Sequence, residues 1–153
     1  MNVNCPRCGQ QMNYSAILWL DDVLRKYLLM RDGLLTIAVA HLLRKRNIKF
    51  DSSVKDDQFE YDFICETKKD KVLVECKVHR LPESKRSVEG SIEQDLNQAK
   101  KHMNALNISS AVVIYNYDLE EYKELVEKGK SKYGVDLLDF SEASDYFSSL
   151  SKG

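Results

Sequence analysis

The pattern of apolar and polar positions predicts two helices in the first third of the chain. Apolar side chains recur with helical spacing over residues 14–30, and Ser15 is a candidate N-cap for this helix. A turn sequence at residues 31–33 separates it from a second helix, expected over residues 34–46. Because the second helix is apolar on most sides, we expect it to be buried.

A β-hairpin with alternating polarity is expected over residues 60–77. β-branched and aromatic residues favour strands on both sides, and the polar residues 67–70 form the break. A four-residue loop places Glu66 opposite Lys71 and, further along the hairpin, Asp62 opposite Glu75. One face is apolar throughout and is expected to be the core side. It carries Tyr61, Phe63, Cys65, Val72, Val74, Cys76 and Val78.

The rest of the chain alternates between strands and helices. We expect a short strand at residues 47–50, polar connectors at 51–57 and a polar loop at 79–90. Further helices are expected over residues 91–106, 119–132 and 141–150, the second after an Asp118 cap and the third after a Ser141 cap, and strands over 111–116 and 135–140. This order predicts an α/β fold with a mixed sheet.

The polar face of the hairpin contains one unfavourable charge pair. Glu66 faces Lys71, which is favourable, whereas Asp62 faces Glu75, and two opposed carboxylates repel each other unless a cation lies between them. Mg²⁺ is typically held by one or two carboxylates, and Mn²⁺ takes similar oxygen ligands. Such a metal would polarise a phosphodiester, and Lys77 on the same face would orient water or stabilise the developing charge. The alternative is a solvated ion-pair face without chemistry.

The spacing of these residues resembles a known family. Asp62 and, after twelve residues, Glu75-Cys76-Lys77 are similar to the motif of the PD-(D/E)xK nuclease superfamily. Over roughly residues 33–116 the chain looks most like its branch of archaeal Holliday-junction resolvases and Mrr-type restriction endonucleases. The resemblance implies a restriction-endonuclease-like mixed sheet, with a catalytic β-hairpin flanked by helices.

The resemblance also implies an activity and roles for particular residues. The protein would be a Mg²⁺-dependent (or Mn²⁺-dependent) DNA endonuclease, with Asp62 and Glu75 as metal ligands and Lys77 as the catalytic lysine. Gln98 matches the Gln of the family's Gln-x₃-Tyr element, and His102 stands where Tyr is usual. The family often has a Glu in the first core helix, but residues 34–43 contain no acid. A non-catalytic nucleic-acid-binding or assembly module that keeps the nuclease fold is therefore the alternative function.

Cys5-Pro6-Arg7-Cys8-Gly9 has the local form of half a zinc site. No second pair of ligands follows at a suitable spacing. Cys65 and Cys76 would be about 13 Å apart along the hairpin, too far to share one Zn²⁺, so we expect them to be buried core thiols. Two copies pooling their Cys5 and Cys8 in a homodimer, a contribution from His41, or an unliganded pair all remain open.

Composition and charge add expectations about location and partners. A balance of 43% hydrophobic and 31% charged residues is that of an ordinary globular protein, and the net charge of −1 favours no partner by itself. No apolar run is long enough for a membrane span and no signal-peptide layout is present, so we expect a cytoplasmic protein without membrane contact.

Basic residues are concentrated in the front of the chain, with eight Lys or Arg against three acids in residues 1–50. Such a bias suits a polyanion partner such as DNA. The candidate DNA contacts are Arg44, Lys45, Arg46, Arg80, Lys85, Arg86 and Lys101. The expected organisation is a Cys-x-x-Cys segment over residues 1–13, an N-terminal helix over 14–32 and a nuclease-like domain over 33–153.

Overall fold

The computed structural model describes residues 3–4, 11–12, 33–56, 59–68, 70–79 and 84–152. The chain separates into two compact units, Met1–Leu34 and Leu35–Gly153. In the first unit, strands β1 (Val3–Asn4) and β2 (Gln11–Met12) pair in an antiparallel hairpin. The Cys5–Cys8 pair and the helix predicted over residues 14–30 lie outside the described residues.

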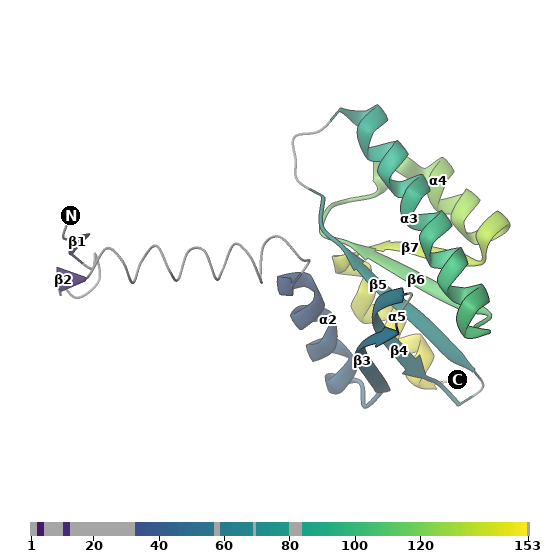
Figure 1. Ribbon diagram of the computed structural model, residues 1–153, viewed down its shortest axis with the longest axis horizontal. Helices are drawn as coiled ribbons and strands as arrows, with labels where there is room; N and C mark the ends of the chain where they lie inside the picture. Colours follow the sequence, from purple (N-terminus) through teal and green to yellow (C-terminus); the bar gives the residue numbers. More distant parts are fainter. Residues whose placement is uncertain are drawn as a thin grey trace. The chain divides into compact units, whose positions relative to one another are not determined.

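The second unit is built around a five-stranded mixed sheet with the order β3-β4-β5-β6-β7 (Figure 1). Its strands are β3 (Lys49–Asp56), β4 (Phe59–Glu66), β5 (Lys71–Lys77), β6 (Ser110–Tyr115) and β7 (Val135–Asp139). β3, β4 and β5 form an antiparallel meander, whereas β5, β6 and β7 run parallel. The prediction of an α/β fold with a mixed sheet is confirmed.

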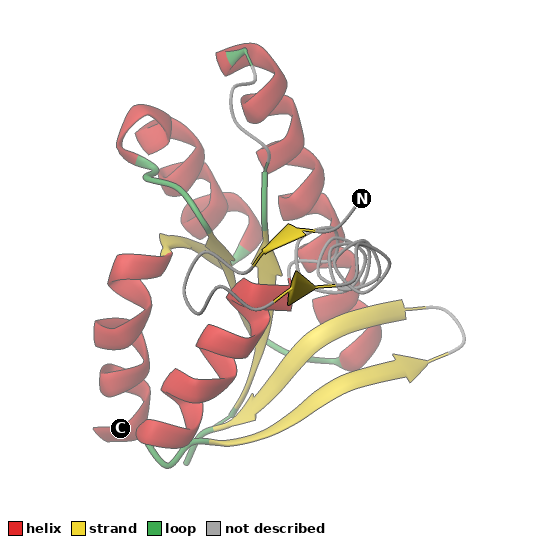
Figure 2. Cartoon of the chain, turned by 90° about the vertical axis from the view of Figure 1, so that its left-hand side faces the viewer, coloured by secondary structure: helices red, strands yellow, loops and turns green. Residues whose placement is uncertain are grey.

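Helices cover both faces of this sheet (Figure 1, Figure 2). α2 (Gly33–Lys45) and α5 (Phe140–Lys152) pack on one face, and α3 (Lys85–Leu106) and α4 (Lys123–Lys128) pack on the other. A 3₁₀ turn, η2 (Glu120–Tyr122), precedes α4, and a π-helical turn, η3 (Gly129–Tyr133), follows it. In the described part of the chain, no helix is both long and apolar enough to cross a membrane.

The hairpin of β4 and β5 has the predicted loop, and its pairing follows the predicted register as far as Phe63–Val74; the predicted Asp62–Glu75 pair is not part of the ladder. The Thr67 backbone N–H donates to the Asp70 carbonyl oxygen (2.9 Å), and the Asp70 N–H donates to Thr67 Oγ1 (3.0 Å), which closes the loop. The ladder runs from Glu66–Lys71 to Phe63–Val74. Beyond the ladder, the side chain of Asp62 contacts β5: its Oδ2 accepts a hydrogen bond from the Cys76 backbone N–H (2.7 Å).

Apolar cores lie on both faces of the hairpin, not only on the face predicted from alternation. Phe63 and Val74 pack with α2 and α5 as expected. The opposite face, which carries the charges, also buries Leu73 against α3. Tyr61 was expected beside Phe63, but it packs in the cluster of Leu73. Full burial of one such large apolar side chain stabilises the fold by about 1.5–3 kcal/mol, so both layers of helices hold the sheet.

Two boundaries differ from the sequence-based expectation. α3 begins at Lys85 instead of residue 91, because Ser84 caps it: the Ser84 Oγ accepts a hydrogen bond from the Ser87 N–H (3.2 Å). The segment expected to be a loop therefore supplies the first turns of a helix. β3 extends over residues expected to be polar connectors, because its backbone pairs with β4 as far as Asp56–Phe59.

The C-terminal elements form nearly where predicted, with different caps. The single helix expected over residues 119–132 is divided into η2, α4 and η3, and it ends at Gly134 with a left-handed φ of 70°. Asp118 does cap its start, since its Oδ1 accepts from the Glu120 N–H (2.7 Å). The cap of α5 is Asp139 instead of Ser141, because Asp139 Oδ1 accepts from the Ser141 N–H (2.7 Å).

Candidate functional site

The candidate site lies where two parallel strands end beneath α3. Lys77 is the last residue of β5 and is paired in register with Tyr115, the last residue of β6. α3 connects these two strands and packs over them, so its inward-facing side chains meet the strand ends. Ligands of open α/β sheets bind beyond the carboxyl ends of the strands, so this edge of the sheet is the candidate ligand site.

Glu75 is a buried carboxylate whose two oxygens have different surroundings. Only 2% of the residue is exposed. Its Oε1 lies 2.7 Å from the Nδ1 of His102 on α3. Its Oε2 lies 3.3 Å from the Lys77 Nζ in an ion pair, but accepts no hydrogen bond from the residues that the structure describes. The alternative of a solvated ion-pair face is therefore wrong for Glu75, because a solvated carboxylate would not be shielded to this degree.

Lys77 is held among three acceptors. Its Nζ lies 3.3 Å from Glu75 Oε2, 3.5 Å from Gln98 Oε1 and 3.9 Å from Asp95 Oδ1. Burial lowers the pKa of Lys77, but the charges of Glu75 and Asp95 outweigh burial and raise this pKa above its usual range. Lys77 is therefore a positively charged hydrogen-bond donor at neutral pH, not a proton acceptor.

Asp95 is a functional candidate that the sequence analysis missed. Its Oδ2 accepts a hydrogen bond from the Tyr115 hydroxyl (3.1 Å) and lies 3.3 Å from the Nε2 of His79. The His79 Nδ1 in turn lies 3.1 Å from the Tyr117 hydroxyl. Burial, and then the charge of Asp95, raise the pKa of Tyr115, so its hydroxyl keeps its proton and remains a donor to Asp95.

The structure brings together most of the predicted catalytic residues. Glu75, Lys77 and Gln98 are in direct contact, and Asp62 is close enough for its charge to raise the pKa of Lys77. The missed residue, Asp95, left a signal in the sequence. On α3 the apolar stripe runs through Ile92, Leu96, Ala99 and Met103, and the polar residues at positions 95 and 102 fall within that stripe. Both are buried.

The donor set of the site suits a hard cation. Within the described residues, no group of three or more His, Cys, Asp or Glu side chains is arranged to hold a metal ion. The oxygen donors at the predicted place are the carboxylates of Asp62 and Glu75, and the Glu75 Oε2 is buried without a hydrogen bond. Mg²⁺ is usually held by one or two carboxylates together with water and substrate phosphates, so these two residues fit such an ion.

The remaining cysteines of the second unit are core residues, as predicted. Within the described residues, neither Cys65 nor Cys76 forms a disulfide, and both are buried. Burial raises the pKa of the Cys65 thiol to about 12, which keeps it protonated and unreactive at neutral pH.

The basic triplet at the end of α2 lies away from the candidate site. α2 covers the face of the sheet opposite to α3, and Arg46 Nη2 donates to Ser144 Oγ on α5 (2.9 Å). Arg44 lies over the ring of Phe50, at 5.8 Å from the centroid. This region adjoins the start of β5, about 20 Å along the strand from Lys77. The predicted DNA contacts Arg44, Lys45 and Arg46 are therefore not brought together with Glu75.

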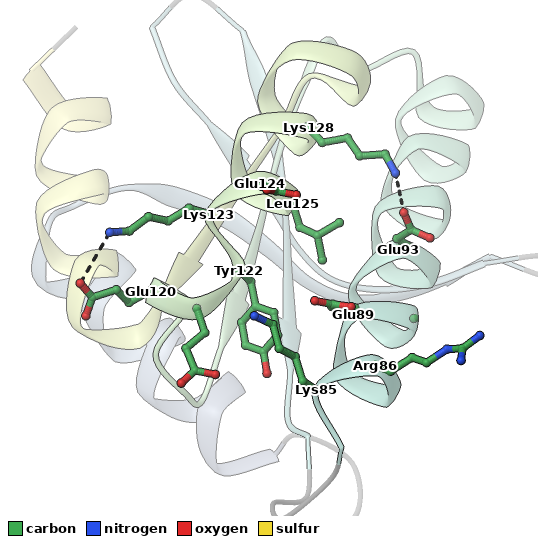
Figure 3. Close-up of a pocket in the computed structure, with 12 residues that line it drawn as sticks. Lys85, Arg86, Glu89, Glu93, Glu120, Tyr122, Lys123, Glu124, Leu125 and Lys128 are labelled. Atoms are coloured by element: carbon green, nitrogen blue, oxygen red, sulfur yellow. Dashed lines mark hydrogen bonds and ion pairs between the residues drawn. The ribbon is translucent and has the colours of Figure 1, made fainter.

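Lys85 and Arg86 line a different cavity, of about 810 Å³, between the first turns of α3 and the η2–α4 segment (Figure 3). The Lys85 Nζ lies 6.0 Å from the centroid of the Tyr122 ring. Lys128 and Glu93 form an ion pair across this cavity, seen as a dashed line in Figure 3. Its other charged lining residues are Glu89, Glu120, Glu121, Lys123 and Glu124. The acids of this mixed lining offset the positive charge of Lys85 and Arg86 and weaken their attraction for a polyanion.

Two further predicted DNA contacts have different outcomes. Lys101 is exposed on α3, one turn beyond Gln98, on the same side of the sheet as Glu75. Arg80 lies outside the described residues.

Comparisons with known proteins give no functional assignment. No family model matches the chain, and no curated protein sequence matches it. Among solved structures, a similar one is the crystal structure of the protein of unknown function AF1548, with 19% sequence identity and a TM-score of 0.48. The match covers 70% of this chain and 57% of that one, so the chain spans little more than half of that protein.

Proposed function

We propose that this protein is a metal-dependent DNA endonuclease that hydrolyses phosphodiester bonds at Asp62, Glu75 and Lys77. We also propose that its mixed sheet is the restriction-endonuclease-like sheet of the PD-(D/E)xK superfamily. The observation that carries the proposal is the position of the Lys77 ammonium, 3.3 Å from a buried carboxylate at the carboxyl end of β5. A fixed cation beside carboxylates that can hold a metal ion is one arrangement that supports phosphodiester hydrolysis.

Electrostatics explains why a divalent cation belongs in the proposal. The carboxylates of Asp62, Glu75 and Asp95 influence one ammonium, that of Lys77, so the cluster has an excess of negative charge. A phosphodiester would be repelled by this excess. Mg²⁺ or Mn²⁺ bound by Asp62 and Glu75 would offset it, polarise the phosphodiester and lower the pKa of a bound water.

The side chains of the chain itself have distinct roles in this proposal. Lys77 stays protonated, so it supplies positive charge and hydrogen bonds to the oxygens on which negative charge develops as water attacks phosphorus. Gln98 accepts a hydrogen bond from Lys77 and limits the directions that the ammonium can take. His102 contacts Oε1 of Glu75, and Oε2 faces the Lys77 ammonium, so a metal ion bound by Glu75 at Oε2 would share that oxygen with Lys77.

The position of the basic residues bears on how DNA would bind. Lys101 follows Gln98 by three residues on α3, and we assign it to phosphate contact beside the site. Arg44, Lys45 and Arg46 lie on the opposite face, so they would contact only a second DNA segment or DNA held by the other subunit of a homodimer.

A cleavage assay with matched variants tests the proposal. Purified protein is incubated with Mg²⁺ or Mn²⁺ and with supercoiled, linear duplex, single-stranded and four-way-junction DNA. We expect cleavage of at least one substrate, reduced at least about 100-fold by Lys77→Met or Glu75→Gln. The matched control is Lys71→Met, at the exposed start of the same strand, which should cleave like the wild type.

A negative result on every substrate would overturn the nuclease proposal. The alternative, a non-catalytic nucleic-acid-binding or assembly module, is favoured by one observation: the first turn of α2 contains no acidic residue. Salt-dependent DNA binding without cleavage would support that alternative. Neutralising Arg44, Lys45 and Arg46 should then weaken binding and flatten its salt dependence.

A further inference from the structure

We propose that Asp95 is a positioning residue that holds the Lys77 ammonium against Glu75, and that His79 and Tyr115 hold Asp95 in turn. The contacts come from three parts of the fold. Lys77 ends β5 and His79 follows it by two residues, Tyr115 ends β6, and Asp95 lies on α3. The arrangement stands on these contacts alone. Only its consequence for cleavage rests on the proposed nuclease function.

The two oxygens of Asp95 are used differently. Oδ2 accepts from the Tyr115 hydroxyl at 3.1 Å and lies 3.3 Å from His79 Nε2, whereas Oδ1 faces the Lys77 Nζ at 3.9 Å. A rotation of the carboxylate out of this orientation would break both contacts of Oδ2 at once. Because only 13% of the side chain is exposed, few water molecules could replace those contacts, which favours the orientation that directs one oxygen toward Lys77.

His79 is itself restrained from several directions. Its ring lies against the rings of Tyr115 and Tyr117, with centroids 5.5 and 5.4 Å apart, and its backbone N–H donates to Asn116 Oδ1 (3.1 Å). Its two ring nitrogens face different partners: Nε2 lies 3.3 Å from Asp95 Oδ2, and Nδ1 lies 3.1 Å from the Tyr117 hydroxyl.

This support matters because a lysine side chain is flexible. Ordering it costs rotamer entropy, which one ion pair does not offset. Glu75 holds the Lys77 ammonium from its own strand, and Asp95 and Gln98 hold it from α3. Without Asp95, the acceptors from α3 would be reduced to one neutral amide. The ammonium would then sample several positions and exchange its protons with water more quickly.

Nuclear magnetic resonance of lysine ammonium groups tests this directly at one fixed pH. In uniformly ¹⁵N-labelled protein, a held ammonium gives a ¹H–¹⁵N signal because its protons exchange slowly, and Lys77→Arg identifies which signal belongs to Lys77. We expect a Lys77 signal in the wild type that is lost in Asp95→Asn and retained in Asp95→Glu. The matched control is Glu93→Gln, another acid-to-amide change on α3 whose partner is Lys128; it should leave the Lys77 signal unchanged.

The outcomes separate this proposal from the nuclease proposal. A folded Asp95→Asn variant with an unchanged Lys77 signal would overturn the positioning role, as would a wild type without any Lys77 ammonium signal. If Asp95→Asn does not fold, Tyr115→Phe removes one of the two Oδ2 contacts and should broaden the Lys77 signal instead.

Where cleavage is observed, Asp95→Asn should lower kcat about 10-fold or more with little change in KM, since it affects an interaction used in the transition state. An inactive wild type with the expected signals would reject the nuclease and keep the positioning role.

Discussion

The Nδ1 of His102 lies 2.7 Å from the Oε1 of Glu75, and only 4% of His102 and 2% of Glu75 are exposed to solvent. The pair joins the last two turns of α3 to β5, near the carboxyl end of that strand. A carboxylate this deep needs a partner, because an uncompensated buried charge or polar group costs several kcal/mol. His102 therefore has a structural task that a surface histidine would not have.

We expect His102→Leu to lower the free energy of unfolding by about 2–4 kcal/mol, since it leaves Oε1 of Glu75 buried without a hydrogen bond. Urea unfolding followed by circular dichroism measures this difference. The double variant Glu75→Leu/His102→Leu removes both polar partners and should recover part of the loss. A single His102→Leu variant with a stability within 0.5 kcal/mol (roughly the effect of a surface substitution) would contradict the assignment.

Stability should fall at alkaline pH because of buried neutral groups. Burial raises the pKa of Cys65 to about 12 and also raises that of Tyr115. In the unfolded chain these groups ionise near about 8.5 and 10, so above these values the unfolded state loses protons that the native state keeps. The free energy of unfolding therefore falls as pH rises, by about 1.4 kcal/mol per pH unit for each such group. Below the pKa that a group has in the unfolded chain, that group does not change the free energy of unfolding.

The measurement is the urea-unfolding free energy at several pH values between 7 and about 10, where Cys65 contributes to the first part of the slope. Cys65→Val removes one ionisable group from a fully buried position while keeping it apolar. We expect its stability to fall less steeply above about pH 8.5 than that of the wild type, by up to about 1.4 kcal/mol per pH unit. Identical slopes would show that Cys65 is not responsible.

The hairpin was predictable because its determinants are local. A polar break of four residues and strict alternation on both sides set which residues of β4 and β5 face each other, and the ladder from Glu66–Lys71 to Phe63–Val74 follows that register. The contact of Lys77 with Glu75 is equally local, since alternate residues of one strand share a face. These two facts account for the part of the site that the sequence analysis found.

The network around Asp95 was not predictable, because it is set by tertiary packing. His79, Asp95 and Tyr115 are far apart in sequence and meet only because α3 crosses over the ends of β5 and β6. The start of α3 was missed for a related reason. Gly90 was taken as part of a loop, although a helix capped by Ser84 and packed on the sheet tolerates one exposed glycine.

β3 was underestimated because it lies at the edge of the sheet. Its residues beyond Phe50 include Asp51 and Ser52, which are exposed and give no alternating apolar pattern. What makes them a strand is the pairing of their backbone with β4, and the register of that pairing depends on the partner strand. The prediction from local propensity therefore ended the strand too early.

Two glycines on the same side of the sheet should respond to alanine in opposite ways. A Cβ at Gly129 would lie 2.9 Å from the carbonyl oxygen of Val135 and 3.1 Å from Leu96 Cδ2, so β7 or α3 would have to shift. We expect Gly129→Ala to cost about 1–3 kcal/mol in thermal or urea unfolding. The matched control is Gly90→Ala, where a Cβ meets nothing within 4 Å in a helix interior, and this change should stabilise by about 0.5–1 kcal/mol. Equal effects at both positions would contradict the close approach at Gly129.

Cation binding can be examined without any cleavage reaction. Mn²⁺ is paramagnetic and broadens the nuclear magnetic resonance signals of nearby nuclei, so it reports where a hard cation binds. If Asp62 and Glu75 form the site, sub-stoichiometric Mn²⁺ should broaden the backbone amide signals around Cys76 more strongly than those around Lys71, which is about 16 Å away at the start of the same strand. Asp62→Asn and Glu75→Gln should each weaken this effect at least about 10-fold, because the ion would then have one carboxylate instead of two.

The control is Glu66→Gln, an exposed carboxylate paired with Lys71, which should leave the broadening at Cys76 unchanged. Broadening that is equal at both ends of β5, or that persists in Glu75→Gln, would exclude this pair of carboxylates as the cation site.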